Sequence, residues 1–250
     1  MKKSTLKEFI TKQPYPLLFT TISGAHLYGF PSPDSDFDLR GVHILPVQEV
    51  VGLNEIKETI EVNKIQDNLE IDLVTQDLKK FFNLLLGRNG NVLEQLYSPL
   101  ILQTTPEHEE LKSIANNCIT RYHAYHYLGF AKSQWKLFTK AETKKIKPLL
   151  YVYRVLLTGI YLMNEGIVEA NLNVLNQEFK LSYLDDLIAK KLAEQEKTTI
   201  ENTEINFYQQ EYERLTIELE TAFENSRLPE EETAKPALND LLIRLRMKNI

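Results

Sequence analysis

The 250-residue sequence contains a single cysteine, Cys118. A disulfide bond within the chain is therefore excluded, and we expect a reducing, cytoplasmic location. The sequence also lacks a long uninterrupted apolar run. Its most apolar stretch, residues 149–163, is short for a membrane span and contains Arg154, so a buried helix and no membrane partner are expected. The N-terminal lysines are followed by no apolar core, which argues against a secretory signal.

Acidic residues are almost missing from one segment of an otherwise acidic chain. Between Arg121 and Arg154 there are eight basic residues and one glutamate, whereas the whole chain has a net charge of −6, so the remainder sums to −13. Such a segment is a candidate phosphate-binding surface. Four of its lysines follow one another at intervals of four: Lys132, Lys136, Lys140 and Lys144. On a helix they form one slanting stripe, which suits either a solvated face or a contact with nucleotide or RNA.

The pattern of residue types changes near residue 105. Before it, β-branched and alternating patterns predict strands over 17–23, 37–45, 57–65 and 69–75 and helices over 5–12, 77–87 and 91–98. After it, glycine is scarce and helical patterns predict helices over 107–118, 120–140, 146–164, 170–178, 183–196, 203–226 and 236–247. We therefore predict an α+β fold, in which a small mixed β-sheet domain (1–105) precedes an all-helical C-terminal domain (106–250).

Acidic residues alternate at the entrance to the second predicted strand. Asp36 and Asp38 are two residues apart, so on a strand their side chains point to the same face. Two adjacent carboxylates repel unless a cation lies between them, and Mg²⁺ takes such carboxylates together with substrate phosphates. A two-metal site needs a third carboxylate, for which Asp72 is the first choice and Glu70 the alternative. Asp34 is interpreted as a turn residue.

A glycine turn precedes these carboxylates. Gly24 follows the first predicted strand and precedes a possible helical turn, where backbone N–H groups bind phosphate well. A strand, a glycine turn and paired carboxylates on the next strand would bring a triphosphate and its metal ions together. The sequence therefore predicts a metal-dependent phosphate site between residues 23 and 40.

The stretch SGAHLYGFPSPDSDFDLRGVHI, residues 23–44, resembles the signature of the DNA polymerase beta-type nucleotidyltransferase superfamily. More narrowly, it is similar to nucleotidyltransferases that are associated with RNA-repair ligases. The resemblance continues through residues 71–99 and, more faintly, through KPLLYVYRVLL and LPEEETAKPALNDLLIRLR. It implies a palm-like nucleotidyltransferase domain over 1–105, with the helices after it closing the nucleotide cleft.

The resemblance also implies a reaction, in which an NMP passes from an NTP to a hydroxyl acceptor and pyrophosphate is released. Two Mg²⁺ ions, for which Mn²⁺ can substitute, would be held by Asp36, Asp38 and Asp72. The implied nucleotide contacts comprise the glycine turn, the arginine after the acidic pair and cations of the helical part: Ser23, Gly24, Ala25, His26, Arg40, Lys144, Lys147 and Arg154.

One position departs from the family pattern. Ala25 stands where the family usually has a serine whose hydroxyl can bond a terminal phosphate. A non-catalytic nucleotide- or RNA-binding module on a degenerate transferase fold therefore stays open. A protein-modifying transferase of the toxin–antitoxin type is a separate alternative, which the long helical half disfavours. The acceptor can be an RNA end, a protein side chain or a small molecule. The sequence predicts neither the preferred base nor the oligomeric state.

Overall fold

The computed structural model describes residues 2–193, 200 and 204–248. The chain forms two compact units. Unit 1 comprises Met1–His26, Asp36–Ile119 and Glu231–Ile250, and unit 2 comprises Leu27–Ser35 and Thr120–Glu230. The single division predicted at residue 105 differs from these units, because the two ends of the helical region pack with the sheet.

Unit 1 contains the sheet. Its elements in chain order are α1 (Lys2–Thr11), β1 (Leu17–Ile22), the start of α2 (Gly24–Tyr28), β2 (Phe37–His43), α3 (Val47–Val51), β3 (Thr59–Gln66), β4 (Leu69–Asp77), α4 (Leu78–Leu86), α5 (Gly90–Leu96), β5 (Ile101–Gln103), α6 (Pro106–Ala115), the single turn η1 (Asn116–Cys118) and α12 (Lys235–Met247). The five strands lie in the order β3-β4-β2-β1-β5. The four predicted strands are confirmed, whereas α3 and β5 were not predicted.

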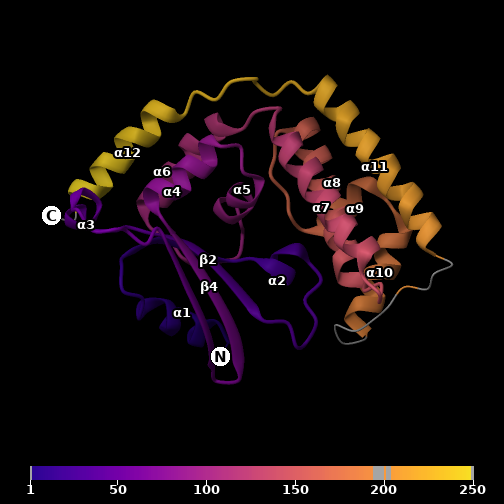
Figure 1. Ribbon diagram of the computed structural model, residues 1–250, viewed down its shortest axis with the longest axis horizontal. Helices are drawn as coiled ribbons and strands as arrows, with labels where there is room; N and C mark the ends of the chain where they lie inside the picture. Colours follow the sequence, from indigo (N-terminus) through magenta and orange to yellow (C-terminus); the bar gives the residue numbers. More distant parts are fainter. Residues whose placement is uncertain (1, 194–199, 201–203, 249–250) are drawn as a thin grey trace. The chain divides into compact units, whose positions relative to one another are not determined.

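Strands β2 and β4 form the parallel pair at the centre of this sheet (Figure 1). Their register places Asp38 opposite Asp72 near one end and His43 opposite Asp77 at the other. The remaining strand pairs are antiparallel. The predicted mixed sheet is therefore confirmed, and its register brings two of the predicted site residues side by side.

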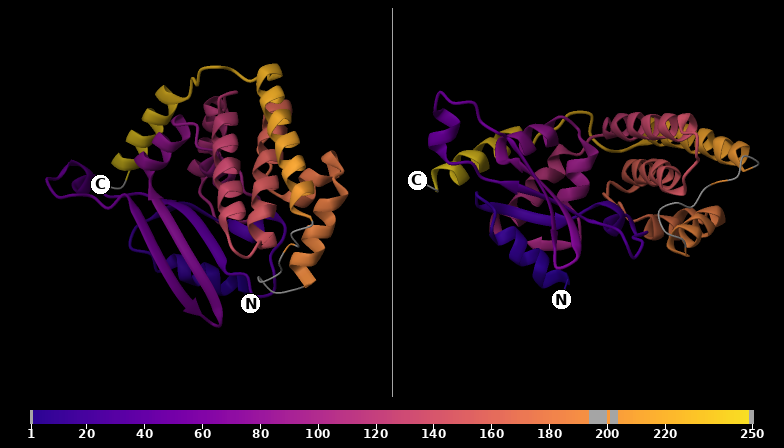
Figure 2. Two further views of the ribbon diagram at one scale, coloured as in Figure 1. Left: turned by 45° about the vertical axis from the view of Figure 1, so that its right-hand side comes forward. Right: turned by 60° about the horizontal axis from the view of Figure 1, so that its bottom comes forward.

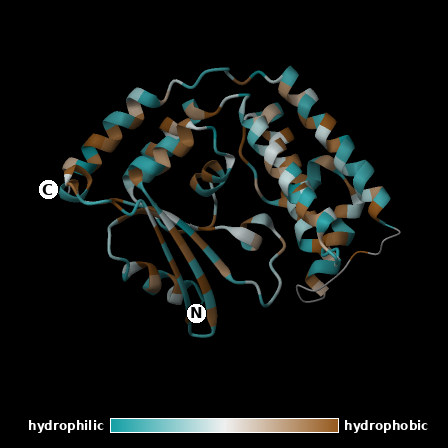
Figure 3. Ribbon diagram, in the orientation of Figure 1, coloured by the Kyte–Doolittle hydropathy of each residue, from teal (hydrophilic) through white to brown (hydrophobic). Residues whose placement is uncertain are grey.

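The two faces of the sheet differ in polarity. Buried residues alternate with half-buried polar ones along β2 and β4, as the hydropathy colours of Figure 3 also show. Helix α1 covers one face, where Phe9 packs in a cluster with Leu39 and Leu73. On the other face Phe19 packs edge-on against Phe81 of α4 and stacks on His108 of α6. Figure 2 shows α1 on one side of the sheet and these helices on the other.

Helix α12 is held to the sheet by a buried ion pair. The guanidinium of Arg246 donates to both carboxylate oxygens of Asp77 at 2.6 Å and also to the carbonyl oxygen of Leu45. Asp77 caps α4 as predicted, because its carboxylate accepts from the N–H of Lys79 at 3.0 Å. One carboxylate thus begins a helix and anchors the C-terminal helix of the unit.

Unit 2 is helical. Its elements are the end of α2, α7 (His123–Lys140), α8 (Ile146–Glu165), α9 (Leu172–Phe179), α10 (Ser182–Ala193) and α11 (Ile205–Asn225). These helices match the predicted ones, although residues 194–196 and 203 of the predictions lie outside the described part. Among the described residues, α8 is the one helix long and apolar enough to cross a membrane, and 78% of its most apolar window is buried inside the protein. Such burial agrees with the predicted core helix.

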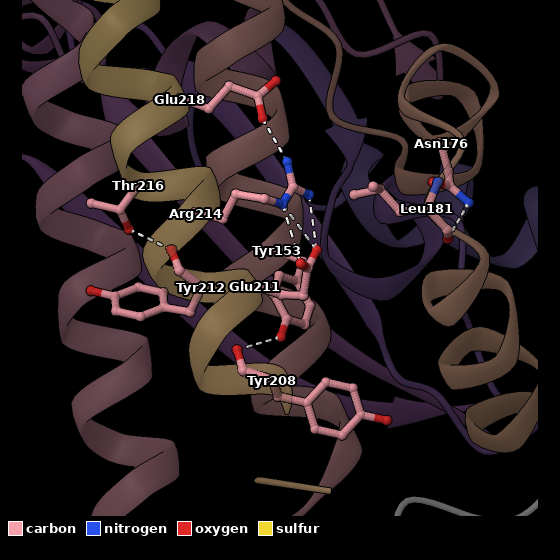
Figure 4. Close-up of polar contacts among 9 residues, drawn as sticks. All are labelled: Tyr153, Asn176, Leu181, Tyr208, Glu211, Tyr212, Arg214, Thr216 and Glu218. Carbon is pink, nitrogen blue, oxygen red and sulfur yellow. Dashed lines mark hydrogen bonds and ion pairs between the residues drawn. The ribbon is translucent and has the colours of Figure 1, made fainter. Parts of the chain in front are cut away.

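One arginine of α11 is paired with two glutamates of the same helix. Arg214 lies between Glu211 and Glu218, at 2.8 and 2.9 Å (Figure 4). On the buried side of the same helix, the hydroxyl of Tyr153 donates to the carbonyl oxygen of Tyr208 at 2.9 Å. Helix α11 is therefore fixed to the core helix α8 by a polar as well as an apolar contact.

Candidate functional site

Asp38 and Asp72 lie next to each other on neighbouring parallel strands. They are register partners of β2 and β4, and both side chains are partly exposed, by 22% and 32%. The strand alternation that buries Phe37 and Leu39 turns Asp38 to the opposite face of the sheet. The predicted convergence of one aspartate from each strand is therefore present in the structure.

A single arginine joins the two carboxylates. Nη2 of Arg40 lies 2.8 Å from Oδ1 of Asp38 and 3.1 Å from Oδ2 of Asp72. Its Nη1 donates to the carbonyl oxygens of Leu39 and Asp72, each at 2.9 Å. Arg40, which was expected to contact nucleotide, is thus paired in this structure with both Asp38 and Asp72.

Gly24 packs directly against one of these carboxylates. It has a φ of +60°, and a Cβ at this position would lie 1.8 Å from Oδ2 of Asp38. The backbone N–H of the preceding Ser23 donates to the carbonyl oxygen of Asp38 at 2.7 Å. A residue with a side chain is excluded here by both space and backbone conformation. The glycine turn and the β2 carboxylate thus form one local arrangement.

Asp36 and Glu70 lie farther along the same face of the sheet. Asp36 and Asp72 both line a groove of about 600 Å³ over strands β3 and β4. The other lining residues are Glu61, Asn63, Lys64, Ile65, Glu70, Ile71 and Val74. Glu70 is exposed, and only Asp72 of the two candidate carboxylates on β4 shares Arg40 with Asp38. The geometry therefore favours Asp72 over Glu70 as the partner of the β2 acids.

The carboxylates are a chemically suitable but incomplete metal site. Among the described residues, no three His, Cys, Asp or Glu side chains are grouped so that they could hold a metal ion. Two carboxylates nevertheless converge on one cation, the guanidinium of Arg40. A pair of carboxylates with substrate phosphates is the usual ligand set of Mg²⁺. The donor chemistry of Asp38 and Asp72 fits this ion, whereas the predicted set of three is not assembled.

The residues after Gly24 are largely enclosed. Ala25 is buried, with 5% of its surface exposed. The ring of His26 stacks on Phe37 with the centroids 4.3 Å apart, and its Nδ1 has no hydrogen-bond partner among the described residues. Burial lowers the pKa of His26, and the neighbouring Lys2 lowers it further. Asp36 opposes this shift of the pKa, but the net effect favours the neutral ring over the charged one.

The predicted cations of unit 2 have structural contacts. Nζ of Lys144 donates to the carbonyl oxygens of Thr139 and Ala141, at 2.6 and 2.5 Å, and so caps the end of α7. Arg154 is fully buried, and its guanidinium lies 3.9 Å from the centroid of the Tyr28 ring. Lys147 is half-buried and contributes to the lowered pKa of Asp34, mainly caused by a hydrogen bond with Ser32. In this conformation Arg154 has no surface to offer to a nucleotide.

Two features of the site were not foreseen from the sequence. Glu61 and Asn63 line the groove because they stand opposite Val74 and Asp72 in the β3–β4 register. Their signal was the alternation of polar and apolar residues in KETIEVNKI, which marks one polar strand face. Nothing in a single sequence indicates the antiparallel register that aligns this face with Asp72.

The chain resembles known proteins over most of its length. The model of the RNA repair pathway DNA polymerase beta family matches residues 1–244. The chain belongs to this family. Its relatives include the uncharacterized protein MJ0002 of Methanocaldococcus jannaschii, 32% identical over 93% of this chain and 96% of the relative. The uncharacterized protein YcgL of Bacillus subtilis is 25% identical over 61% of this chain and 58% of that protein.

Solved structures also match the chain. A nucleotidyltransferase-like protein from Exiguobacterium sibiricum matches 90% of this chain and 75% of its own with a TM-score of 0.36 and 12% identity. Membership in the polymerase beta family confirms the family suggested by residues 23–44 and supports a general nucleotidyltransferase role. The predicted α+β fold is confirmed as well.

Proposed function

We propose that the protein is a metal-dependent nucleotidyltransferase that moves an NMP from an NTP to a hydroxyl acceptor and releases pyrophosphate. The observation that carries the proposal is the convergence of Asp38 and Asp72 on one cation beside Gly24. Family membership adds the polymerase beta-type reaction as the chemistry for which such carboxylates serve.

The chain's own residues have distinct tasks in this reaction. Asp38 and Asp72 would hold Mg²⁺ or Mn²⁺, and Asp36, which lines the groove with Asp72, would be the third carboxylate once ions and nucleotide are bound. When bound, the ions neutralise phosphate charge and activate the acceptor hydroxyl for in-line attack on the α-phosphate. Gly24 leaves the Asp38 carboxylate in place because it has no Cβ. Positioning and charge neutralisation then supply most of the rate enhancement.

Label transfer from α-labelled NTPs in the presence of Mg²⁺ tests the proposal. We expect Asp38→Asn and Asp72→Asn to lose transfer by about 100-fold or more, since each removes a charged metal ligand. Asp240→Asn is the matched control, because Asp240 is 67% exposed on α12 and pairs with Arg244. Transfer by Asp38→Asn at the wild-type rate would contradict the assignment.

Ala25 is the observation that favours the second candidate, a non-catalytic nucleotide- or RNA-binding module. Calorimetry with a non-hydrolysable NTP separates the two functions. Binding that depends on Mg²⁺ and is weakened by Asp38→Asn supports the transferase. Tight NTP binding that is independent of Mg²⁺, together with no label transfer to any acceptor, supports the binding module instead.

An RNA end is the acceptor that we propose first. Helix α7 contains no acidic residue, and three of its lysines, Lys132, Lys136 and Lys140, are exposed. Because they follow one another at intervals of four residues, these three lysines lie along one side of the helix, which we call the α7 lysine face. In the part of the chain that the structure describes, these lysines make no ion pair with a carboxylate, unlike Arg214 on α11. Unpaired lysines on one helix face complement the phosphates of a nucleic acid.

Changes to the α7 lysine face test the acceptor. Lys132→Gln/Lys136→Gln/Lys140→Gln should weaken RNA binding and reduce the dependence of log Kd on log salt, since fewer counterions are released. Lys79→Gln/Lys80→Gln/Lys112→Gln, in unit 1, is a control with the same loss of charge. Equal RNA affinity of both triple variants would exclude the α7 lysine face and favour a small-molecule or protein acceptor.

A further inference from the structure

We propose that Arg40 is an internal counter-cation, which holds Asp38 and Asp72 while the site is free of metal and must be displaced by a divalent ion. The proposal rests on the metal-dependent reaction described above and gives it a control point. Arg40 would then act in exchange with the metal ion, in addition to any contact with a nucleotide.

The position of the guanidinium is the first argument. Nη2 lies within 3.1 Å of one oxygen of each carboxylate, between two side chains that the β2–β4 register fixes opposite each other. A cation that is to be shared by Asp38 and Asp72 must occupy the same region. The guanidinium therefore stands where a bridging divalent ion would have to bind.

Anchoring of the guanidinium is the second argument. Nη1 donates to the carbonyl oxygens of Leu39 and Asp72, each at 2.9 Å, so four hydrogen bonds hold the group in one orientation. The Arg40 side chain is only 21% exposed. These contacts hold the guanidinium of Arg40 against the central β2–β4 pair of the sheet rather than free in solvent.

Charge is the third argument. A guanidinium and a divalent ion that share two carboxylates repel each other at short range, and partial burial reduces the screening of this repulsion by water. The divalent ion can therefore bind the two carboxylates only when the guanidinium of Arg40 moves away from them. Phosphates that arrive with the ion are good partners for a released guanidinium, since its planar donors match phosphate oxygens. Metal binding should consequently be weak without nucleotide and stronger with it.

Mn²⁺ binding measured by electron paramagnetic resonance tests the exchange without any need for catalysis. We expect Arg40→Gln to bind Mn²⁺ alone on the order of tenfold more tightly than the wild type, because the competing charge is gone. Addition of a non-hydrolysable NTP should raise the Mn²⁺ affinity of the wild type more than that of Arg40→Gln. Unchanged or weaker Mn²⁺ binding by Arg40→Gln would overturn the proposal.

Two further variants separate position from net charge. Lys64 lines the same groove without contacting either carboxylate by a hydrogen bond, so Lys64→Gln removes one positive charge from the groove and should change Mn²⁺ affinity much less. Arg40→Lys keeps a cation near the two carboxylates but loses the planar hydrogen-bond pattern, so its Mn²⁺ affinity should lie between those of the wild type and Arg40→Gln. If Lys64→Gln tightens Mn²⁺ binding as much as Arg40→Gln does, the loss of positive charge alone explains the effect, and the proposed exchange is wrong.

Unfolding measurements show that the variant is folded and provide a second readout. In EDTA, Arg40→Gln should have a lower unfolding midpoint than the wild type because Asp38 and Asp72 repel each other. Mn²⁺ should raise the midpoint of Arg40→Gln by more than that of the wild type. Addition of Asp38→Asn to the variant should restore the midpoint in EDTA, and no recovery would contradict the repulsion.

The outcomes distinguish this proposal from the proposed function. Tight Mn²⁺ binding by Arg40→Gln, combined with no nucleotide transfer by the wild type, would support the exchange and exclude the proposed transferase activity. Transfer by the wild type with equal Mn²⁺ affinities in both proteins leaves the transferase and removes the exchange. Absence of Mn²⁺ binding by every variant overturns both.

Discussion

Strands β2 and β4 carry an arginine–carboxylate contact near each of their two ends, and the contacts differ in burial. Near one end Arg40 bridges Asp38 and Asp72, whose side chains are 22% and 32% exposed. At the other end Arg246 binds Asp77, and these side chains are 8% and 1% exposed. The same kind of ion pair, arginine with aspartate, is thus accessible to solvent and ligands at one end of these strands, which we call the open end. It is buried at the other end, which we call the closed end.

Burial decides what each contact can do. A partly exposed arginine can leave its carboxylates, because water or an arriving ion takes over the charge. Arg246 has no such substitute, since Asp77 is enclosed between the sheet and helix α12. The open end is therefore suited to the exchange of Arg40 for a divalent ion, and the closed end to the stability of the fold.

The largest expected effect comes from breaking the buried contact. Arg246→Met should lower the free energy of unfolding by about 3–5 kcal/mol, because Asp77 remains as a buried charge without its partner. Urea denaturation followed by circular dichroism measures this loss. Arg246→Met/Asp77→Asn should recover part of it, although the weaker α4 cap remains. A loss as small as that of a surface ion pair would show that Asp77 is rehydrated when Arg246 is absent.

At the open end, the expected loss of stability is smaller and comes from the backbone. Gly24→Ala should lower the free energy of unfolding by about 1–3 kcal/mol, since alanine is strained at a φ of +60° and its Cβ displaces the Asp38 carboxylate. Mn²⁺ affinity should change with it. Urea denaturation and Mn²⁺ titration check both effects.

Gly129 supplies the matched control. It lies inside α7, and a methyl group added at its Cβ position would point into open space. Gly129→Ala should therefore raise the free energy of unfolding by about 0.5–1 kcal/mol through helix propensity. Equal effects of the two substitutions would show that Gly24 is not required by its contact with Asp38.

The contrast between the two ends also shows what a single sequence can predict. The alternation of Asp36, Phe37, Asp38 and Leu39 is local, and it correctly assigned the charged and apolar sides of β2. The cap at Asp77 is local too, since its partner is two residues away. Patterns of this range are fixed by backbone geometry, which is the same in every protein.

Contacts between distant residues were beyond prediction. Arg246 is 169 residues from Asp77 and reaches it only because α12 packs with the sheet. Arg154 was predicted to contact nucleotide but lies on the ring of Tyr28, the last residue of α2, which belongs to the helical unit 2. The strand β5 pairs with β1 through two residues only, too few for a periodic signal. In each case the partner of the residue or strand is set by tertiary packing, which local sequence patterns do not indicate.

pH offers a third way to separate the two ends. His43 is 1% exposed opposite Asp77, and burial lowers its pKa below the ordinary value of 6.5. Asp77 opposes this shift and Arg246 adds to it. The unfolded chain therefore binds a proton at His43 more readily than the folded chain, so its contribution to stability is complete above pH 6.5 and declines below it.

The measurement is the free energy of unfolding between pH 7.5 and 5. We expect the free energy of unfolding of the wild type to decrease as the pH is lowered. In His43→Gln this decrease should be smaller. His26 has a lowered pKa as well, so His26→Gln shows how much of the slope belongs to the open end. A slope that His43→Gln leaves unchanged would mean that the closed end does not sense pH.

The smallest expected effect uses a neighbour of Arg246 on the same helix. Arg244 pairs with Asp240 and Glu110, but its side chain is 48% exposed. Arg244→Met should cost a small fraction of the loss expected for Arg246→Met, and salt should reduce the cost further because exposed charges are screened. Urea denaturation at low and high salt compares the two variants. Equal losses would show that the position on α12, rather than the burial of Asp77, makes the closed end of the sheet stable.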